Sequence, residues 1–327
     1  MVSQDSLLVT LVKLVDRLPM PPLPTKRGRG HPKVYSDRLF LKALVIMIVR
    51  HLHTVHELLA VLAQPTQEMS TLRTVLTEQG RFPTRRTWER RLKAIPQTLP
   101  AQIGCLGRYL VEVIQPWDAS GRAVAIDSTI LRARGGLWHQ KQREQGIVPH
   151  SSIDQEAHWT KSGWHGWIYG WKLHLVSTVA AIWLPLAASL TPANGADSDQ
   201  APALLRELPA DVRFVLGDRH YNRDEVRMLC WQDNRLLVTT QYGRYPHTDD
   251  GAQVRRVFHK LRSVAIENFN EHFKGIFDGH GQVPTKGLIS TQRFALGAVF
   301  VYQLAVLYRF EHGQAPCVGL KAFLKAA

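Results

Sequence analysis

The sequence predicts an α/β fold in which a mixed sheet carries flanking helices and follows an all-helical N-terminal region. Three observations support this prediction. Before Pro116, apolar residues recur at helical spacing. After it, apolar runs of strand length alternate with helical segments. Two aspartates, Asp127 and Asp218, end strand-like runs, and Glu267 lies in a helical segment, so these acids are the candidate functional residues.

The composition indicates a globular protein with a polyanionic partner. Of 327 residues, 45% are hydrophobic, which favours a folded core over disorder. The net charge of +14 is typical of nucleic-acid binding, because clustered Lys and Arg displace counterions from phosphate, although a solvated basic surface is the alternative. The three cysteines form no CxxC pair, which argues against a disulfide scaffold or a thiolate zinc site and fits a reducing compartment.

No segment has the pattern of a signal peptide or a membrane span. The apolar stretches 43–49 and 295–308 fall short of about 18–20 uninterrupted residues, and we interpret both as buried helices. We therefore expect a cytoplasmic protein with no membrane partner.

The N-terminal region is expected to be a set of short helices. They cover residues 3–18, 37–52, 54–63, 71–79 and 85–93, with a proline-rich spacer after the first. Thr84 caps the last helix, which is strongly basic. A helix, a short turn and a basic helix indicate a helix-turn-helix motif, although any basic amphipathic helix has the same pattern. The candidate DNA-binding side chains of this helix are Arg85, Arg86, Arg90 and Arg91.

A second basic segment lies between the first two helices. Arg27 and Arg29 alternate with Gly28 and Gly30, a pattern that suits insertion into a narrow minor groove. A disordered basic linker is the alternative.

The second part of the chain reads as strands and helices in alternation. We predict strands over 122–133, 166–180, 182–190, 213–217 and 235–240, and helices over 198–208, 224–232, around Glu267 and over 291–310. Residues 134–165 are expected to be a long polar loop. Two tryptophans of this part, Trp167 and Trp171, are expected to be buried, and Trp231 is assigned to the core, with stacking on a flipped base as its alternative.

The chemistry open to the three acids is metal-dependent phosphodiester hydrolysis. Two divalent ions about 4 Å apart can activate a water and stabilise the leaving oxygen, and Mg²⁺ prefers carboxylate oxygens. Each acid could instead have a purely structural role. Asp127 can cap a turn, Asp218 can pair with Arg219, and Glu267 can be a solvated helix residue.

Four segments in order resemble the DDE transposases of bacterial insertion sequences. They are Ala125 to Thr129, Tyr169 to His174, Leu216 to Tyr221, and Ile266 to Lys274. The resemblance covers about residues 120–310. It implies a ribonuclease H-like catalytic domain over 119–313, a helical DNA-binding region over 1–118 and a C-terminal tail over 314–327.

The resemblance also implies an activity and a site. Asp127, Asp218 and Glu267 would be the catalytic and metal-binding residues, and the cofactor would be two Mg²⁺ ions, replaceable by Mn²⁺. The enzyme would bind double-stranded DNA at terminal inverted repeats, cleave it, and join the freed 3′-OH to target DNA as a homodimer in a synaptic complex. It would work in the bacterial cytoplasm, on the nucleoid when bound to DNA. A metal-dependent nuclease without strand transfer and an inactive DNA-binding regulator remain alternatives.

The third acid lies in a segment that matches the family signature in part. Lys274 follows Glu267 by seven residues, as the resemblance requires, and is assigned a phosphate contact. The signature arginine is expected four residues before the glutamate, where Ser263 stands; Arg262 lies one residue further away. The signature tyrosine is replaced by His259 or Lys260. Glu271 is the rival third ligand, and Lys172 is placed near the catalytic sheet as a further candidate DNA contact.

Overall fold

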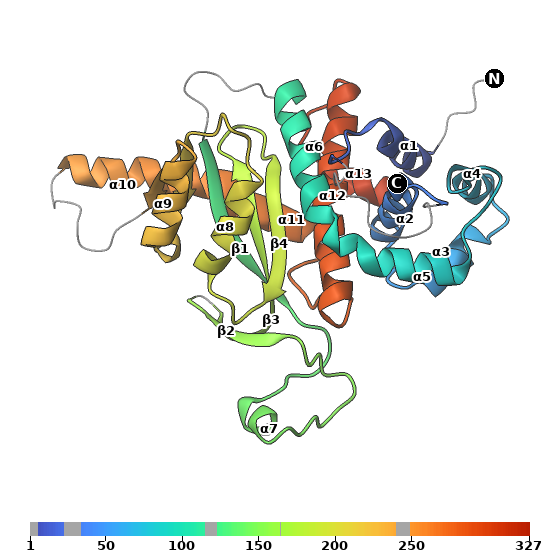
Figure 1. Cartoon of the computed structure of the whole chain (residues 1–327), viewed down its shortest axis with the longest axis horizontal. Helices are drawn as coiled ribbons and strands as arrows, with labels where there is room; N and C mark the ends of the chain where they lie inside the picture. The colour runs from blue at the N-terminus through green and yellow to red at the C-terminus, as the bar shows by residue number, and fades with distance from the viewer. Residues whose placement is uncertain (1–5, 23–33, 115–122, 164, 240–248) are drawn as a thin grey trace.

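The computed structural model describes residues 6–22, 34–114, 123–163, 165–239 and 249–327. The predicted basic hook at Arg27 and Arg29 lies outside the described residues. The molecule has two sides that share one hydrophobic core: a cluster of N-terminal helices, and a six-stranded mixed sheet with helices on its faces (Figure 1). The predicted fold class is confirmed.

Five of the N-terminal helices overlap predicted segments, although the fourth begins four residues before the predicted start at residue 71. They are α1 (Leu7–Leu14), α2 (Asp37–Val49), α3 (Val55–Leu62), α4 (Gln67–Val75) and α5 (Arg85–Ala94). Hydroxyl side chains begin them. Ser6, Ser36, Thr54, Thr66 and Thr84 each accept a hydrogen bond from a backbone N–H of the first turn. Helix α2 is buried along almost its whole length and forms the centre of this cluster.

Helix α6 (Leu99–Ile114) is the longest element that the sequence patterns do not predict. It packs against strand β4 (Pro185–Pro192) and helix α12 (Leu288–Glu311). A side chain at Gly107 would collide with the backbone of Pro185 and Leu186, so this glycine allows the close approach of helix and strand. The apolar face of α6 thus packs against the sheet, and only the tertiary contacts show this packing.

The sheet is built around strand β1 (Ala123–Arg132). On one side β1 pairs antiparallel with β3 (Gly166–Thr178), whose outer edge pairs first with β2 (His158–Ser162) and then with β4. On the other side β1 pairs in parallel with β5 (Phe214–Gly217), which pairs in parallel with β6 (Leu236–Thr239). The C-terminal ends of β1, β5 and β6 therefore point the same way.

Helices cover both faces of this sheet. Helix α8 (Asp197–Arg206) packs on β1, β3 and β4, and α9 (Asp224–Gln232) packs on β6. The opposite face is covered by a continuous helical run of α10 (Asp249–Arg262), a π-helical turn (Ser263–Glu267) and α11 (Asn268–Ile276). The π-helical turn lies against β1 and β3. In Figure 1, α8 and α9 lie in front of the strands and α11 behind them.

Helix α12 belongs to both sides of the molecule. It packs against α1, α2, α5 and α6, and against β4. Gln303 donates from one amide nitrogen to the carbonyls of Ile103 in α6 and Pro185 in β4, at 2.9 and 2.8 Å. Arg293 donates to the carbonyl of His53 at 2.8 Å. By length and composition this helix is apolar enough to cross a membrane, but 78% of its apolar window is buried in the fold. The predicted buried helix around residues 295–308 is confirmed.

Three sequence expectations need correction. The connection between α4 and α5 spans residues 76–84 and carries the isolated bridge between Glu78 and Arg81, so it is longer than the turn of a helix-turn-helix. The expected loop 134–165 contains α7 (Gln140–Glu144) and strand β2. The expected C-terminal tail contains α13 (Leu320–Ala326), which buries Leu320 against the core and packs beside α11 and α12.

Candidate active site

Asp127 lies in the middle of the central strand, on the face that the π-helical turn covers. Its neighbour Ser128 points to the other face, because side chains alternate along a strand. The Asp127 side chain is 17% exposed. Burial raises its pKa to about 7, and the nearby carboxylates of Asp218 and Asp197 raise it as well, while Arg262 acts in the opposite direction. The effect of burial on this carboxyl therefore outweighs that of the one cation in contact with it.

Asp218 follows directly after β5. The parallel register pairs Ala125 with Leu216, so Asp127 and Asp218 lie at corresponding positions two residues further along the chain in each case. Asp218 accepts a hydrogen bond from the backbone N–H of His220 at 2.8 Å and begins the 3-10 turn Arg219–Tyr221. The two aspartates that the sequence places 91 residues apart are thus brought to one edge.

Glu267 is the last residue of the π-helical turn. Arg262, at the end of α10, donates from one guanidinium nitrogen to Glu267 Oε1 at 2.9 Å and from the other to Asp127 Oδ2 at 3.2 Å. The arginine side chain is only 13% exposed. One buried cation therefore joins two of the three predicted acids, and the third, Asp218, follows the strand next to Asp127.

The π-helical turn explains why the arginine stands one residue further from the glutamate than the family signature requires. In a regular α-helix, residues five apart lie roughly 140° apart around the axis and do not face each other. A π-helical turn absorbs one extra residue and brings such a pair together. Arg262 and Glu267 are five apart and in direct contact. The shifted spacing therefore leaves their contact intact.

The residues of this centre suit divalent metal ions in their chemistry, though not in their present positions. Within the described residues, no three His, Cys, Asp or Glu side chains lie close enough together to hold one ion. The donor set is nevertheless three carboxylates, which are hard oxygen ligands. The buried Tyr221 hydroxyl and Arg262 Nε have no hydrogen-bond partner. The guanidinium of Arg262 stands between two acids where a cation is needed, so it must move before a metal ion can bind.

Glu271 and Lys274 lie on the next turns of the helix. Lys274 pairs with Glu271 at 3.7 Å, and His280 lies 3.9 Å from the same carboxylate. Glu271 is 66% exposed and shares no contact with Asp127, whereas Glu267 shares Arg262 with it. The geometry thus favours Glu267 over its rival, and the role of Lys274 stays a prediction.

Lys172 lies on the other face of the sheet from Asp127. Its ammonium contacts Asp197 Oδ1 and donates to the Gly195 carbonyl, both at 3.0 Å, and its side chain is 13% exposed. The sequence indicates Asp197 only as a helix cap; in the structure it is the first residue of α8, and its side chain contacts strands β1 and β3. The motif Lys172-Leu173-His174 was the signal that could have revealed this cluster.

The basic helix α5 presents part of its predicted arginine set to solvent. Trp88 and Leu92 are fully buried and anchor the helix; Trp88 packs edge-on against Phe40. Arg86 and Arg90 are exposed one turn apart. The remaining two have protein partners: Arg85 pairs with Glu89, and Arg91 pairs with Asp37 and lies over the ring of Phe40.

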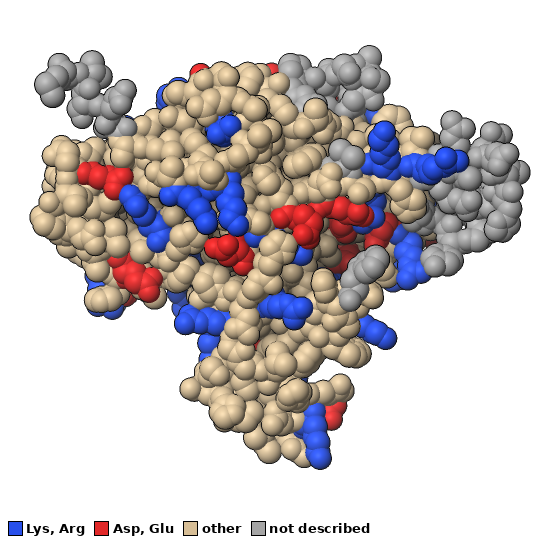
Figure 2. Space-filling model, turned by 180° about the vertical axis from the view of Figure 1, so that it is seen from behind, with Lys and Arg blue, Asp and Glu red and all other residues tan. Residues whose placement is uncertain are grey.

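The face of the molecule seen from behind, relative to Figure 1, carries acidic and basic side chains close together on the side of α10 (Figure 2).

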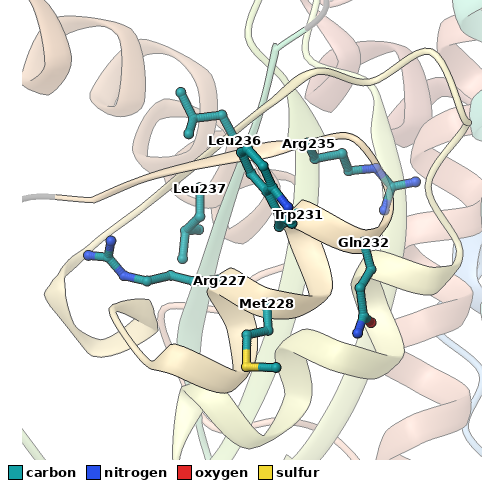
Figure 3. Close-up of a pocket in the computed structure, with 7 residues that line it drawn as sticks. All are labelled: Arg227, Met228, Trp231, Gln232, Arg235, Leu236 and Leu237. Atoms are coloured by element: carbon teal, nitrogen blue, oxygen red, sulfur yellow. The ribbon is translucent and has the colours of Figure 1, made fainter.

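Two tryptophan assignments are wrong. Trp231 is 77% exposed rather than buried, and Trp167 is 66% exposed; Trp171 is fully buried, as expected. Trp231 and Leu236 line an open pocket of about 380 Å³ with five other residues (Figure 3). Leu236 pairs with Phe214 at the start of the strands, about 10 Å along β5 from the end that carries Asp218. This pocket is therefore not part of the acidic centre.

Comparisons with known proteins identify the family of this chain. The family model for the transposase DDE domain matches residues 118–304. Two solved structures are similar, a pre-cleavage Mos1 transpososome and a Mos1 transposase paired-end complex with the left transposon end. Each is 13% identical to this chain, covers 92% of it and 82% of its own chain, and has a TM-score of 0.23. No curated protein gives a significant sequence match. The predicted ribonuclease H-like fold is confirmed by the family match and the strand order.

Proposed function

This chain belongs to the transposase DDE domain family, and from that premise we propose that it cuts DNA at the ends of a mobile element and joins the freed 3′-OH to target DNA. Family membership makes it a DNA transposase. The metal requirement, the strand transfer and the residues that carry them are the content of the proposal. Two copies would act together, because two element ends must be cut.

The observation that carries the proposal is the shared guanidinium. Asp127 and Glu267 are 140 positions apart in the sequence, yet both contact Arg262, and Asp218 lies on the neighbouring strand. Two carboxylates share one cation, and the third acid follows the neighbouring strand at the corresponding position. Carboxylates that separate elements bring to one end of a sheet are hard oxygen ligands of the kind that divalent cations prefer.

Asp127, Asp218 and Glu267 would hold the metal ions. When bound, Mg²⁺ ions supply the charge that activates a water and stabilises the leaving oxygen of a phosphodiester. The strand position of Asp127 and the turn after β5 fix two of the carboxylates on rigid elements. The π-helical turn, which covers this face of the sheet, carries the third carboxylate, Glu267.

Arg262 would serve two states of the protein. Without metal ions, it neutralises Asp127 and Glu267. Released from these carboxylates, the guanidinium would be free to contact a phosphate of the bound strand bidentately. Lys274, seven residues after Glu267 in the same helical run, would contact another phosphate.

Binding of element ends would rest on the N-terminal helices. Arg86 and Arg90 are exposed side chains on α5, which Trp88 anchors to the core. Arginines one turn apart on an exposed helix suit contacts with the phosphate backbone or the major groove. Because this surface is separate from the acids, loss of catalysis and loss of binding should be separable.

The test is cleavage of a duplex that carries the repeats flanking this gene. We expect Asp127→Ala and Glu267→Ala to abolish Mg²⁺-dependent cleavage and to leave the mobility-shift affinity unchanged. Glu271→Ala is the matched control on the next helical turn and should cleave as the wild type does. Retained cleavage in Asp127→Ala would refute the proposed centre. Cleavage without joined products in a plasmid integration assay would restrict the activity to that of a nuclease.

A further inference from the structure

Behind the candidate centre lies a second group of charged side chains. Asp197 Oδ1 accepts a hydrogen bond from Ser128 Oγ at 2.9 Å and contacts Lys172 Nζ at 3.0 Å. Lys172 also donates to the carbonyl of Gly195. The fully buried ring of His174 places Nδ1 at 3.7 Å from the same carboxylate oxygen. The Asp197 side chain is 18% exposed, so this is a mostly buried, fixed arrangement.

These contacts grip strand β1 at the residue next to Asp127. Ser128 pairs with His174 in the β1–β3 register, and its side chain lies on the α8 face of the sheet. The carboxylate of Asp127 lies on the opposite face, where Arg262 holds it. Adjacent residues of one strand are thus held from both faces, by a carboxylate on one side and a guanidinium on the other.

Strand β1 needs this support because its pairing with β5 ends before it reaches Asp127. The parallel pairing of β1 with β5 extends as far as Ala125 and Leu216. Asp127 and Asp218 follow two residues later, beyond this pairing. The separation of the two carboxylates therefore depends on what else holds β1, and metal centres tolerate little error in the position of their ligands.

We propose that Asp197 is a positioning residue for DNA cleavage: with Lys172 it holds Ser128, and through Ser128 it fixes strand β1 so that Asp127 stands at the right distance from Asp218. This inference rests on the proposed function. It gives Lys172 a role in the protein interior, as the cation that balances Asp197, in place of a contact with DNA.

Two simpler roles for Asp197 make different predictions. A carboxylate in the first turn of a helix stabilises the helix dipole, but Asp199 lies in the same first turn of α8 and is exposed. A direct metal ligand would have to face Arg262, whereas Asp197 faces Ser128 on the other side of the sheet. Asp199 and Ser128 therefore offer variants that separate these roles.

The experiment compares single and double variants of the full chain. Asp197→Ala removes the carboxylate, and Asp197→Asn keeps an oxygen that can accept from Ser128 and Lys172. Ser128→Ala breaks the link to β1 and leaves the ion pair in place. Asp199→Ala is the matched control for loss of a first-turn charge. Three quantities are measured: the single-turnover cleavage rate at saturating DNA, the Mn²⁺ affinity of the DNA-free protein by electron paramagnetic resonance, and the melting temperature.

We expect Asp197→Ala to lower the cleavage rate and the Mn²⁺ affinity by about 10- to 100-fold, the range seen when outer partners of metal ligands are removed. Asp197→Asn should stay within about threefold of the wild type. Ser128→Ala should lose about tenfold, and the double variant Ser128→Ala/Asp197→Ala should be no worse than Asp197→Ala within about twofold, because both changes break one linkage. Asp199→Ala should match the wild type in all three measurements.

Several results would overturn the inference. If Asp197→Ala and Asp199→Ala lower the melting temperature alike and leave Mn²⁺ affinity and cleavage unchanged, Asp197 is only a structural charge. If Ser128→Ala is inert or additive with Asp197→Ala, Asp197 does not act through β1. Should Asp197→Ala fail to fold, Ser128→Ala and Asp197→Asn decide the question. A wild type that cleaves while Ser128→Ala equals it refutes the positioning role alone. A wild type that neither binds Mn²⁺ nor cleaves refutes the proposed function and this inference with it.

Discussion

Replacing Asp127 by Asn should make the metal-free protein more stable at neutral pH while it abolishes cleavage. The folded protein raises the pKa of this carboxyl from its ordinary 3.8 to about 7. At about 1.36 kcal/mol for each whole number of pKa difference, the ionised Asp127 costs the folded state about 4 kcal/mol above pH 7. The cause is burial next to Asp218 and Asp197, which Arg262 offsets only in part.

The sign of this effect can be followed through the titration. A carboxyl whose folded pKa is raised contributes full stability below pH 3.8, where both states are protonated. It loses that stability as pH rises towards about 7, because only the unfolded state ionises freely. Between pH 5 and pH 8 the loss amounts to about 2.5 kcal/mol. Asn cannot ionise, so the variant escapes the loss, and Arg262 keeps its contact with Glu267.

The assay is thermal unfolding in EDTA at pH 5 and pH 8, for the wild type, Asp127→Asn and the control Asp224→Asn, which changes an exposed carboxylate. The histidines titrate in all three proteins and cancel in the differences. We expect the advantage of Asp127→Asn over the wild type to grow by about 5 to 10 °C from pH 5 to pH 8, at roughly 2–4 °C per kcal/mol. A difference that does not change with pH, or a variant less stable than the wild type at pH 8, would refute the reasoning.

Three further predictions concern other parts of the molecule. Arg262→Gln should tighten Mn²⁺ binding to the DNA-free protein about tenfold, since a competing cation leaves the carboxylates, yet slow cleavage; weaker Mn²⁺ binding in calorimetry would contradict this. Replacing Arg86 and Arg90 together by Gln should reduce the slope of log affinity against log salt by about 1.8, whereas replacing both lysines of α13 should leave it unchanged; equal slopes would exclude α5 from the interface. Trp88→Ala should cost about 3–5 kcal/mol in urea unfolding, because the ring is fully buried between Phe40 and Phe82; a cost below about 1 kcal/mol would mean that α5 is not anchored there.

The sequence was most informative where a pattern is local. Apolar runs of strand length placed Asp127 and Asp218 on two predicted strands, and the segment around Glu267 was predicted to be helical. The boundaries of the helix over 85–93 agreed closely because its hydroxyl cap, Thr84, was recognised in the sequence, whereas the cap at Thr66 was not and the helix predicted over 71–79 lies four residues earlier. These features depend on residues within a few positions of one another, which is why a single sequence contains them.

The remainder depends on contacts that a single sequence does not show. The burial of α6 against β4 depends on the backbone at Pro185, some 80 positions away from Gly107. The π-helical turn that joins Arg262 to Glu267 looks in the sequence like an imperfect signature. Trp231 is large and apolar, as core residues are, but it lies beside β6, an edge strand, and is therefore exposed to solvent. Each of these depends on which elements become neighbours.

Helix α12 has a mechanical consequence. Its hydrogen bonds reach α6, β4 and the carbonyl of His53 just before α3, so one stiff rod is fastened to both the helical cluster and the sheet. A load applied at α5 would be carried along this rod to β4 rather than absorbed by a flexible joint. In the proposed transposase, grasping an element end and cutting it would therefore be motions of the same body, and strain in one would be felt in the other.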